Sequence, residues 1–154
     1  MIFIGIDPGQ KGGIAILSNS MNKGVLMPLY GKEIDAAAIL EYINEVQGER
    51  FVCVEKAQAM PKQGVVSMFK YGKGFGKILG VLESSRISHQ LVTPQAWKKI
   101  VLAGTNRDKH AAIEFCQRMY PMIDLQPGKC RTPQDGIADA VCIAHFAKLM
   151  EKKI

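Results

Sequence analysis

The sequence is poor in the residues that build zinc-bound or disulfide-linked small proteins. Its 154 residues include only four cysteines, at positions 53, 116, 130 and 142, and no two of them form a Cys-x-x-Cys pair. This spacing argues against a structural zinc site. Cys53 and Cys142 lie in apolar runs, where buried free thiols are expected, and such usage is typical of a reducing compartment.

Long apolar runs are also missing. No stretch approaches the ~20 apolar residues of a membrane-spanning helix, so no membrane partner is expected. The N-terminus enters strand-like sequence at once, without the basic and apolar regions of a secretion signal. We therefore expect a cytoplasmic protein whose residues 1–154 form one domain.

Acidic residues are scarce in the second part of the chain. Residues 61–154 hold 15 Lys or Arg against 7 Asp or Glu, whereas residues 1–60 hold 5 against 7. A basic half of this kind favours a polyanionic partner, and nucleic acid is the commonest one. A lysine-rich surface that serves only solubility is the alternative.

The hydrophobic pattern predicts an α/β fold. Strands are predicted at residues 1–7, 12–18, 24–30, 50–56 and 89–94, and helices at 33–47, 65–85, 94–102, 107–120 and 132–153. The first three strands follow one another closely and should be antiparallel, while the later strands are joined through helices and should be parallel. We expect a mixed five-stranded sheet flanked by helices, with Thr132 as the N-cap of the last helix and Pro133 at its first position.

Carboxylates occur at the ends of two apolar strands and inside one apolar helix. Asp7 ends the first strand, Glu55 ends the fourth, and Asp139 lies in the apolar run of the last helix. Buried carboxylates need partners, and carboxylates from distant parts of a chain can converge on Mg²⁺. Asp135 lies one turn before Asp139 on the same helix face, although it also fits a helix cap. A turn cap is the alternative for Asp7.

Three motifs in order give a family resemblance. "IGIDPG", "VEKAQAM" and "DGIADAVCIA" resemble the RuvC-type Holliday junction resolvases of the RNase H-like superfamily. The four-residue spacing of Asp135 and Asp139, with Gly136 between them, is closer to the mitochondrial and phage branches of this family than to the bacterial enzymes. The loop "AMPKQGVVSMFKYGKGFG" also looks more like phage RuvC-like proteins. The resemblance implies a bacterial or phage-infected host cell.

The resemblance implies an activity and a site. It implies an RNase H-like fold and a homodimer that resolves four-way DNA junctions by paired, metal-dependent phosphodiester hydrolysis. The acidic set Asp7, Glu55, Asp135 and Asp139 would hold two Mg²⁺ ions, or Mn²⁺ in their place. In "TPQAWKK" the resemblance makes Lys98 a DNA contact, and in "RDKHAA" it places Lys109 near the active site.

The middle of the chain combines cations with aromatic residues. The candidate DNA-binding residues are Lys56, Lys62, Lys70, Lys73, Lys77, Lys98, Lys99, Arg107 and Lys109. Lys70, Lys73 and Lys77 share one helix face, as a basic stripe. This face could bind the phosphates of a DNA backbone, or it could simply be exposed to solvent. Met60, Phe69 and Tyr71 are candidates for a wedge or for base stacking, with core packing as the alternative.

Glycines give two further expectations. Gly72, Gly76 and Gly80 share one helix face, which predicts close approach of the sheet or of a second subunit, and this face is the candidate dimer interface. The glycines of the 9–13 turn should keep it thin, so that a DNA backbone can approach. Trp97 is expected to be a core or hinge residue.

Other functions remain open at this point. A related RNase H-like nuclease could act on other branched DNA or on RNA/DNA hybrids. A non-catalytic nucleic-acid-binding module would leave the acidic set without a role. The opening "IGIDPGQKGGIAIL" also resembles the phosphate loop of the actin and sugar-kinase fold, although 154 residues leave little room for the second half that such proteins need.

Overall fold

The computed structural model describes residues 1–152, so the end of the predicted last helix, at Lys153, lies outside the described residues. The strands are β1 (Ile2–Asp7), β2 (Gly13–Leu17), β3 (Asn22–Leu26), β4 (Leu29–Tyr30), β5 (Glu33–Ile34), β6 (Arg50–Glu55) and β7 (His89–Val92). The helices are α1 (Ala36–Asn44), α2 (Val65–Ser84), α3 (Pro94–Val101), α4 (Lys109–Met119) and α5 (Asp135–Glu151).

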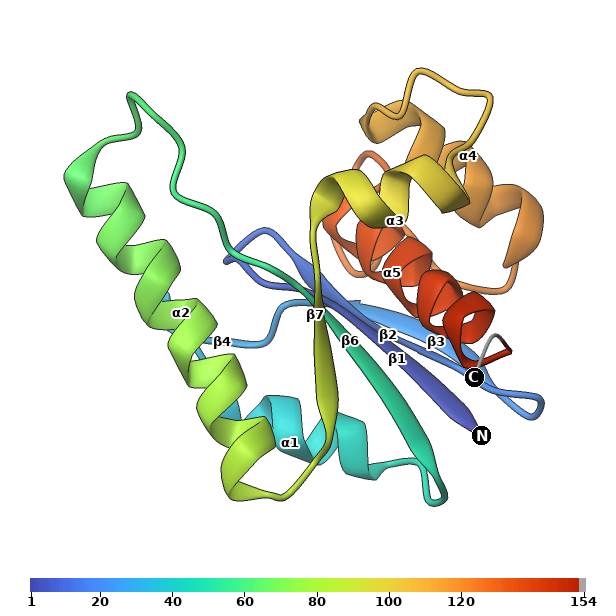
Figure 1. Ribbon diagram of the computed structural model, residues 1–154, viewed down its shortest axis with the longest axis horizontal. Helices are drawn as coiled ribbons and strands as arrows, with labels where there is room; N and C mark the ends of the chain where they lie inside the picture. Colours follow the sequence, from blue (N-terminus) through green and yellow to red (C-terminus); the bar gives the residue numbers. More distant parts are fainter. Residues whose placement is uncertain (153–154) are drawn as a thin grey trace.

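A mixed five-stranded sheet forms the centre of the molecule, in the order β3-β2-β1-β6-β7. β1, β2 and β3 pair antiparallel, whereas β1, β6 and β7 pair parallel. The predicted sheet, including its antiparallel first three strands, is confirmed. The helices cover both faces, with α1 and α2 on one side and α3, α4 and α5 on the other (Figure 1).

Strand alternation divides the core between these two layers. Ile2, Ile4 and Ile6 of β1 belong to the apolar cluster that includes α1 and α2, whereas Phe3 belongs to the cluster built around α5. The central strands are buried on both faces because helices cover both. Within the part of the chain that the structure describes, no helix is long and apolar enough to cross a membrane.

The predicted strand at 24–30 is wrong in extent. β3 begins at Asn22 and stops at Leu26, and residues 29–30 instead pair with β5 in a separate two-stranded sheet. Pro28 has no backbone N–H to give to a ladder, which breaks the strand there. The side-chain amide of Gln10 donates to the Lys32 carbonyl and holds this small hairpin against the β1–β2 turn.

Two predicted helix starts are also wrong. The helix expected at 33–47 begins at Ala36, because the Asp35 carboxylate caps it by accepting from the Ala38 N–H at 3.1 Å. The last helix begins at Asp135 with Gln134 as its N-cap, so Thr132 and Pro133 lie before the helix. Asp135 therefore occupies the first helical position rather than the end of a capping box.

The predicted long helix, α2, is confirmed, and three of its glycines face outward. A Cβ added at Gly72, Gly76 or Gly80 would meet nothing within 4 Å, so the sheet does not approach this face. The glycine that packs is Gly74, where a Cβ would lie 2.6 Å from Ile34 Cδ1. Gly74 thus lets α2 lie close against β5.

Candidate functional site

Two carboxylates meet at one end of the sheet. β1 and β6 run parallel with Ile6 opposite Val54, and Asp7 and Glu55 are the next residues along each strand. Side chains alternate between the two faces of a strand. Asp7 therefore lies on the same face of β1 as Phe3, and Glu55 on the same face of β6 as Cys53, and both of these apolar residues belong to the cluster around α5. Asp7 and Glu55 are therefore placed on the α5 side, at the carboxyl ends of neighbouring strands.

Helix α5 reaches this edge because small residues remove the space between helix and sheet. A Cβ at Gly5 would lie 2.1 Å from the Ala140 carbonyl oxygen, and one at Gly136 would lie 2.1 Å from the Lys11 carbonyl oxygen. A Cβ at Gly13 would come within 2.8 Å of the Gly136 carbonyl oxygen. These contacts seat the first turns of α5, with Asp135 and Asp139, on the β1–β2 turn.

The expected role of the turn glycines is therefore corrected. Gly12 and Gly13 make room for protein backbone, from the turn itself and from α5, and not for DNA. Gly9 differs from them, because a Cβ there would meet Tyr71 only at 3.5 Å, an ordinary contact distance. The close packing at the β1–β2 turn thus places helix α5 next to Asp7 and Glu55.

The carboxylates act on one another's ionisation. Burial raises the pKa of Asp7 well above its usual range, and the charges of Glu55, Asp139 and Asp135 raise it further. Burial likewise raises the pKa of Asp139 to about 7, although the Lys98 charge opposes the shift. Such mutually raised pKa values mark a group of carboxylates that lacks compensating positive charge.

Two of these carboxylates have internal partners. The Trp97 indole donates from Nε1 to Glu55 Oε2 at 2.6 Å, and this bond opposes the rise that burial causes in the Glu55 pKa. Lys109 Nζ lies 2.9 Å from Asp135 Oδ2, which raises the pKa of the lysine. Trp97 is fully buried, so the core expectation is confirmed. Its contact with Glu55 was not predicted, since a buried indole N–H needs an acceptor but the sequence does not name it.

The donor set fits a hard divalent cation in its chemistry. Four carboxylates supply the oxygen ligands that Mg²⁺ prefers. The raised pKa values of Asp7, Glu55 and Asp139 show that a bound cation would stabilise their ionised forms. Among residues 1–152, however, no three His, Cys, Asp or Glu side chains are arranged closely enough to hold an ion as they stand. The Glu55 carboxylate is instead hydrogen-bonded to Trp97, and the Asp135 carboxylate is paired with Lys109.

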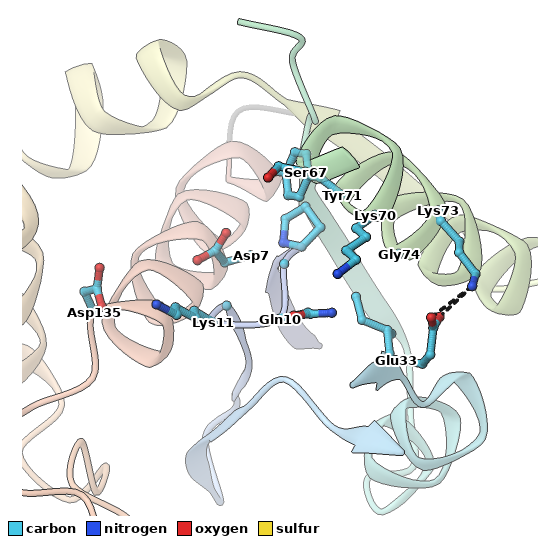
Figure 2. A pocket seen from close by; sticks show the side chains of 14 residues that line it. Asp7, Gln10, Lys11, Glu33, Ser67, Lys70, Tyr71, Lys73, Gly74 and Asp135 are labelled. Carbon is cyan, nitrogen blue, oxygen red and sulfur yellow. Dashed lines mark hydrogen bonds and ion pairs between the residues drawn. The ribbon is translucent and has the colours of Figure 1, made fainter. Parts of the chain in front are cut away.

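A cavity of about 580 Å³ opens beside Asp7 and extends to helix α2. Figure 2 shows Asp7, Lys11 and Asp135 at one side and Lys70 and Tyr71 of α2 at the other. Its lining residues are Asp7, Pro8, Gly9, Gln10, Lys11, Gly12, Glu33, Ile34, Ser67, Lys70, Tyr71, Lys73, Gly74 and Asp135. The cavity thus joins the carboxylate edge to part of the predicted basic stripe.

The predicted basic residues fall into three groups. Lys98 and Lys109 lie at the carboxylates, where their charges act on Asp139. Lys73 and Lys77 both pair with Glu33 of β5, at 3.0 and 3.4 Å. The third group is exposed and consists of Lys56, Lys62, Lys70, Lys99 and Arg107, of which Lys70 also lines the cavity. Glu33 was not predicted to engage the stripe, because it lies far away in sequence.

The three wedge or stacking candidates differ in their surroundings. Met60 and Phe69 are exposed, at 57% and 72% of their surface. Tyr71 is half-buried and lies against Gly9, near the carboxylates. Phe75 packs partly against the core. Base stacking by Met60 and Phe69 stays a prediction.

Comparison with known proteins gives one kind of match. No protein-family description matches the sequence, and no curated protein matches it in sequence either. Among solved structures, the chain is similar to Thermus thermophilus RuvC, with 19% identity, a TM-score of 0.62, and coverage of 99% of this chain and 97% of that one. It is also similar to T. thermophilus RuvC in complex with a Holliday junction substrate, with 19% identity, a TM-score of 0.66, and coverage of 98% and 96%.

These matches extend over nearly the full length of both chains, and they agree with the strand order and the helix layers described above. The expected RNase H-like architecture is confirmed. The chain has the fold of RuvC.

Proposed function

We propose that this protein is a metal-dependent, structure-selective endodeoxyribonuclease that resolves four-way DNA junctions. The observation that carries the proposal is the convergence of Asp7, Glu55 and Asp139 at one sheet edge of a RuvC fold, with Asp135 one helical turn away. A solved structure of the same fold holds a Holliday junction substrate. This structural match supports branched DNA as the substrate class.

Asp7, Glu55, Asp135 and Asp139 would hold the metal, as two Mg²⁺ or Mn²⁺ ions. When bound, divalent cations neutralise such carboxylates and supply the Lewis acidity that phosphodiester hydrolysis needs. The protein contributes orientation: the Trp97 indole fixes Glu55, and the glycine contacts of α5 fix Asp139 relative to Asp7. Lys109 and Lys98 bring positive charge to a place where a phosphodiester would gain negative charge.

The basic residues would hold the DNA backbone. Lys70 lines the cavity beside Asp7, and the exposed Lys56, Lys62, Lys99 and Arg107 extend positive charge around it. Each phosphate contact contributes affinity that falls as salt rises. Exposed Phe69 and Met60 would meet unpaired bases at the branch point.

A homodimer would supply the two active sites that paired cuts need. The open face of α2, with Gly72, Gly76 and Gly80, is the proposed interface, because it accepts a close neighbour and nothing within residues 1–152 fills it. Gly76→Ala should weaken dimerisation in sedimentation equilibrium. If the dimer keeps its affinity, the interface lies elsewhere.

The proposed activity is tested with synthetic substrates. Wild type with Mg²⁺ should cleave a four-way junction faster than a linear duplex, a flap or an RNA/DNA hybrid. Asp7→Asn and Glu55→Gln should abolish cleavage, whereas Glu41→Gln, an equivalent change at an exposed residue of α1, should not. Faster cleavage of the flap or the hybrid would move the proposal to another RNase H-like nuclease. Full activity in Asp7→Asn would overturn it.

A further inference from the structure

One stripe of α2 faces the candidate active site. Ser67, Lys70, Tyr71 and Gly74 follow helical spacing and all line the cavity that begins at Asp7 (Figure 2). This stripe differs from the Lys70, Lys73 and Lys77 stripe of the sequence, because Lys73 and Lys77 are paired with Glu33. On the helix side the cavity wall therefore carries the Ser67 hydroxyl, the Lys70 ammonium and the Tyr71 phenol, beside Lys73, whose ammonium is paired with Glu33.

Tyr71 is held in place on this wall. Its ring lies over the β1–β2 turn, where a Cβ at Gly9 would be 3.5 Å from Tyr71 Cε2 and 4.0 Å from Cδ2. The close packing of Gly74 on Ile34 holds helix α2, and with it Tyr71, near the β1–β2 turn. Tyr71 is half-buried, unlike Phe69, which is 72% exposed. Its position suits contact with a DNA backbone rather than insertion between bases.

The phenol hydroxyl is a donor without an acceptor. Within residues 1–152 no group forms a hydrogen bond with it, and it is not sealed in the core, where the unpaired side-chain atoms are Tyr42 Oη and Arg50 Nε. Burial, and then the charges of Asp7 and Glu55, raise the pKa of Tyr71 to about 12, so it keeps its proton at neutral pH. A half-buried hydroxyl that retains its proton beside a carboxylate edge is suited to bind an anionic oxygen of a ligand.

We propose that Tyr71 is a substrate-binding residue of the active site, whose hydroxyl donates a hydrogen bond to a non-bridging phosphate oxygen of the DNA strand that is cut. Lys70, one residue before it on the same wall, supplies positive charge to that backbone. This proposal rests on the proposed nuclease function and adds a residue to it. It also replaces the stacking role considered for Tyr71 in the sequence.

Tyr71→Phe tests the hydroxyl alone, since it keeps the ring on Gly9. We expect kcat/KM for the four-way junction to fall about tenfold or more, the size expected for a lost hydrogen bond to a charged group. The melting temperature should stay unchanged. Tyr30→Phe is the matched control, because Tyr30 is 81% exposed and lies outside the cavity, and it should cleave like wild type.

A phosphate scan separates binding from a structural role. Junctions are made with one methylphosphonate linkage, at the scissile position or at either flanking position, which removes the anionic oxygen. The Tyr71→Phe penalty should vanish at the one linkage that Tyr71 contacts and persist at the others. An equal penalty at every linkage, or no penalty on the natural junction, would overturn the proposal.

The two proposals fail separately. If wild type binds junction DNA but does not cut it, the nuclease proposal fails, and the same variants are compared by fluorescence anisotropy for junction affinity. Weaker binding of Tyr71→Phe than of Tyr30→Phe would then still support the phosphate contact, and equal binding would refute it. If wild type binds no DNA, both proposals fall.

Discussion

Two neighbouring carboxylates at the same sheet edge have different surroundings. Glu55 accepts a hydrogen bond from the buried Trp97 indole, which holds down a pKa that burial raises. Asp7 has no such donor among the described residues, and three other carboxylates add to the effect of burial. Glu55 is therefore an oriented anion, whereas Asp7 is the group that most needs a cation.

Trp97→Phe should remove the orientation of Glu55 and let its pKa rise. The acidic limb of the pH profile of kcat/KM should then move to higher pH, because Glu55 must be ionised to work. The change also shortens a buried side chain, so the melting temperature should fall. Leu102→Val is a control for that loss, since Leu102 is equally buried, and it should leave the pH profile in place.

The raised pKa values also predict how the metal-free protein responds to pH. Asp139 has a pKa of about 7 in the folded protein against 3.8 for the ordinary carboxyl group. Between these values the folded state binds more protons than the unfolded state, so this group makes stability fall as pH rises. Asp139→Asn should therefore melt higher than wild type at pH 8 in chelator, with a smaller difference at pH 5.5.

Mg²⁺ should act in the same direction on the wild type. It should raise the melting temperature more at pH 8 than at pH 5.5, because the ionised carboxylates bind it. Asp139→Asn should lose most of this gain. An equal effect of Mg²⁺ on both proteins at both pH values would contradict the assignment of Asp139 as a ligand.

At the scale of the elements, the fit of α5 onto the β1–β2 turn decides whether the carboxylates meet. Gly136→Ala would place a Cβ 2.1 Å from the Lys11 carbonyl oxygen and 2.8 Å from Gly12 Cα, so the helix must move. We expect a loss of about 1–3 kcal/mol in the free energy of unfolding, measured in urea. Junction cleavage should fall further than this loss explains, because Asp139 moves with the helix.

Gly64→Ala is the matched control for that change. A Cβ there would meet only Ser67 Oγ, at 3.9 Å, so the helix need not move. Stability should fall only by the loss of the glycine N-cap of α2, and cleavage should stay close to wild type. If Gly136→Ala also behaves like wild type, the close seating of α5 does not position the carboxylates.

Much of this arrangement was predictable from local sequence. The strands that end in Asp7 and Glu55 were predicted because each contains a continuous apolar run. The long helix α2 was predicted despite its glycines. Errors arose where one residue breaks a pattern, as at Pro28, or where the N-cap is another residue than expected, Asp35 for α1 and Gln134 in place of Thr132 for α5. The site residues stay predictions, although the structure brings their carboxylates within range of one another's charges.

Contacts between distant elements were not predictable in the same way. Gly74 and Gly136 are packed against backbone or side chains, whereas Gly72 and Gly76 face open space. The spacing of glycines in the sequence does not show which of them are packed and which are open. The Trp97–Glu55 bond and the pairing of Glu33 with two lysines also join elements far apart in sequence. Such pairs depend on the tertiary fold, not on local periodicity.

At the scale of the whole molecule, one acidic residue limits the basic surface. Glu33→Gln would free Lys73 and Lys77 for phosphate contacts. Junction affinity should rise, and the log–log dependence of affinity on salt should steepen by up to about two. Fluorescence anisotropy at several KCl concentrations measures both, with Glu41→Gln as the control for lost charge alone. An unchanged slope would show that these lysines lie outside the DNA path.

The seating of Gly136 on the β1–β2 turn also sets when the acidic site appears during synthesis. Asp7 and Glu55 leave the ribosome well before α5, which follows them in the chain. Until it docks, two of the four carboxylates are missing and one face of β1 has no cover. A chain truncated before Asp135 should therefore lack the proposed cleavage activity, because half of the acidic set and the helix that carries it are missing.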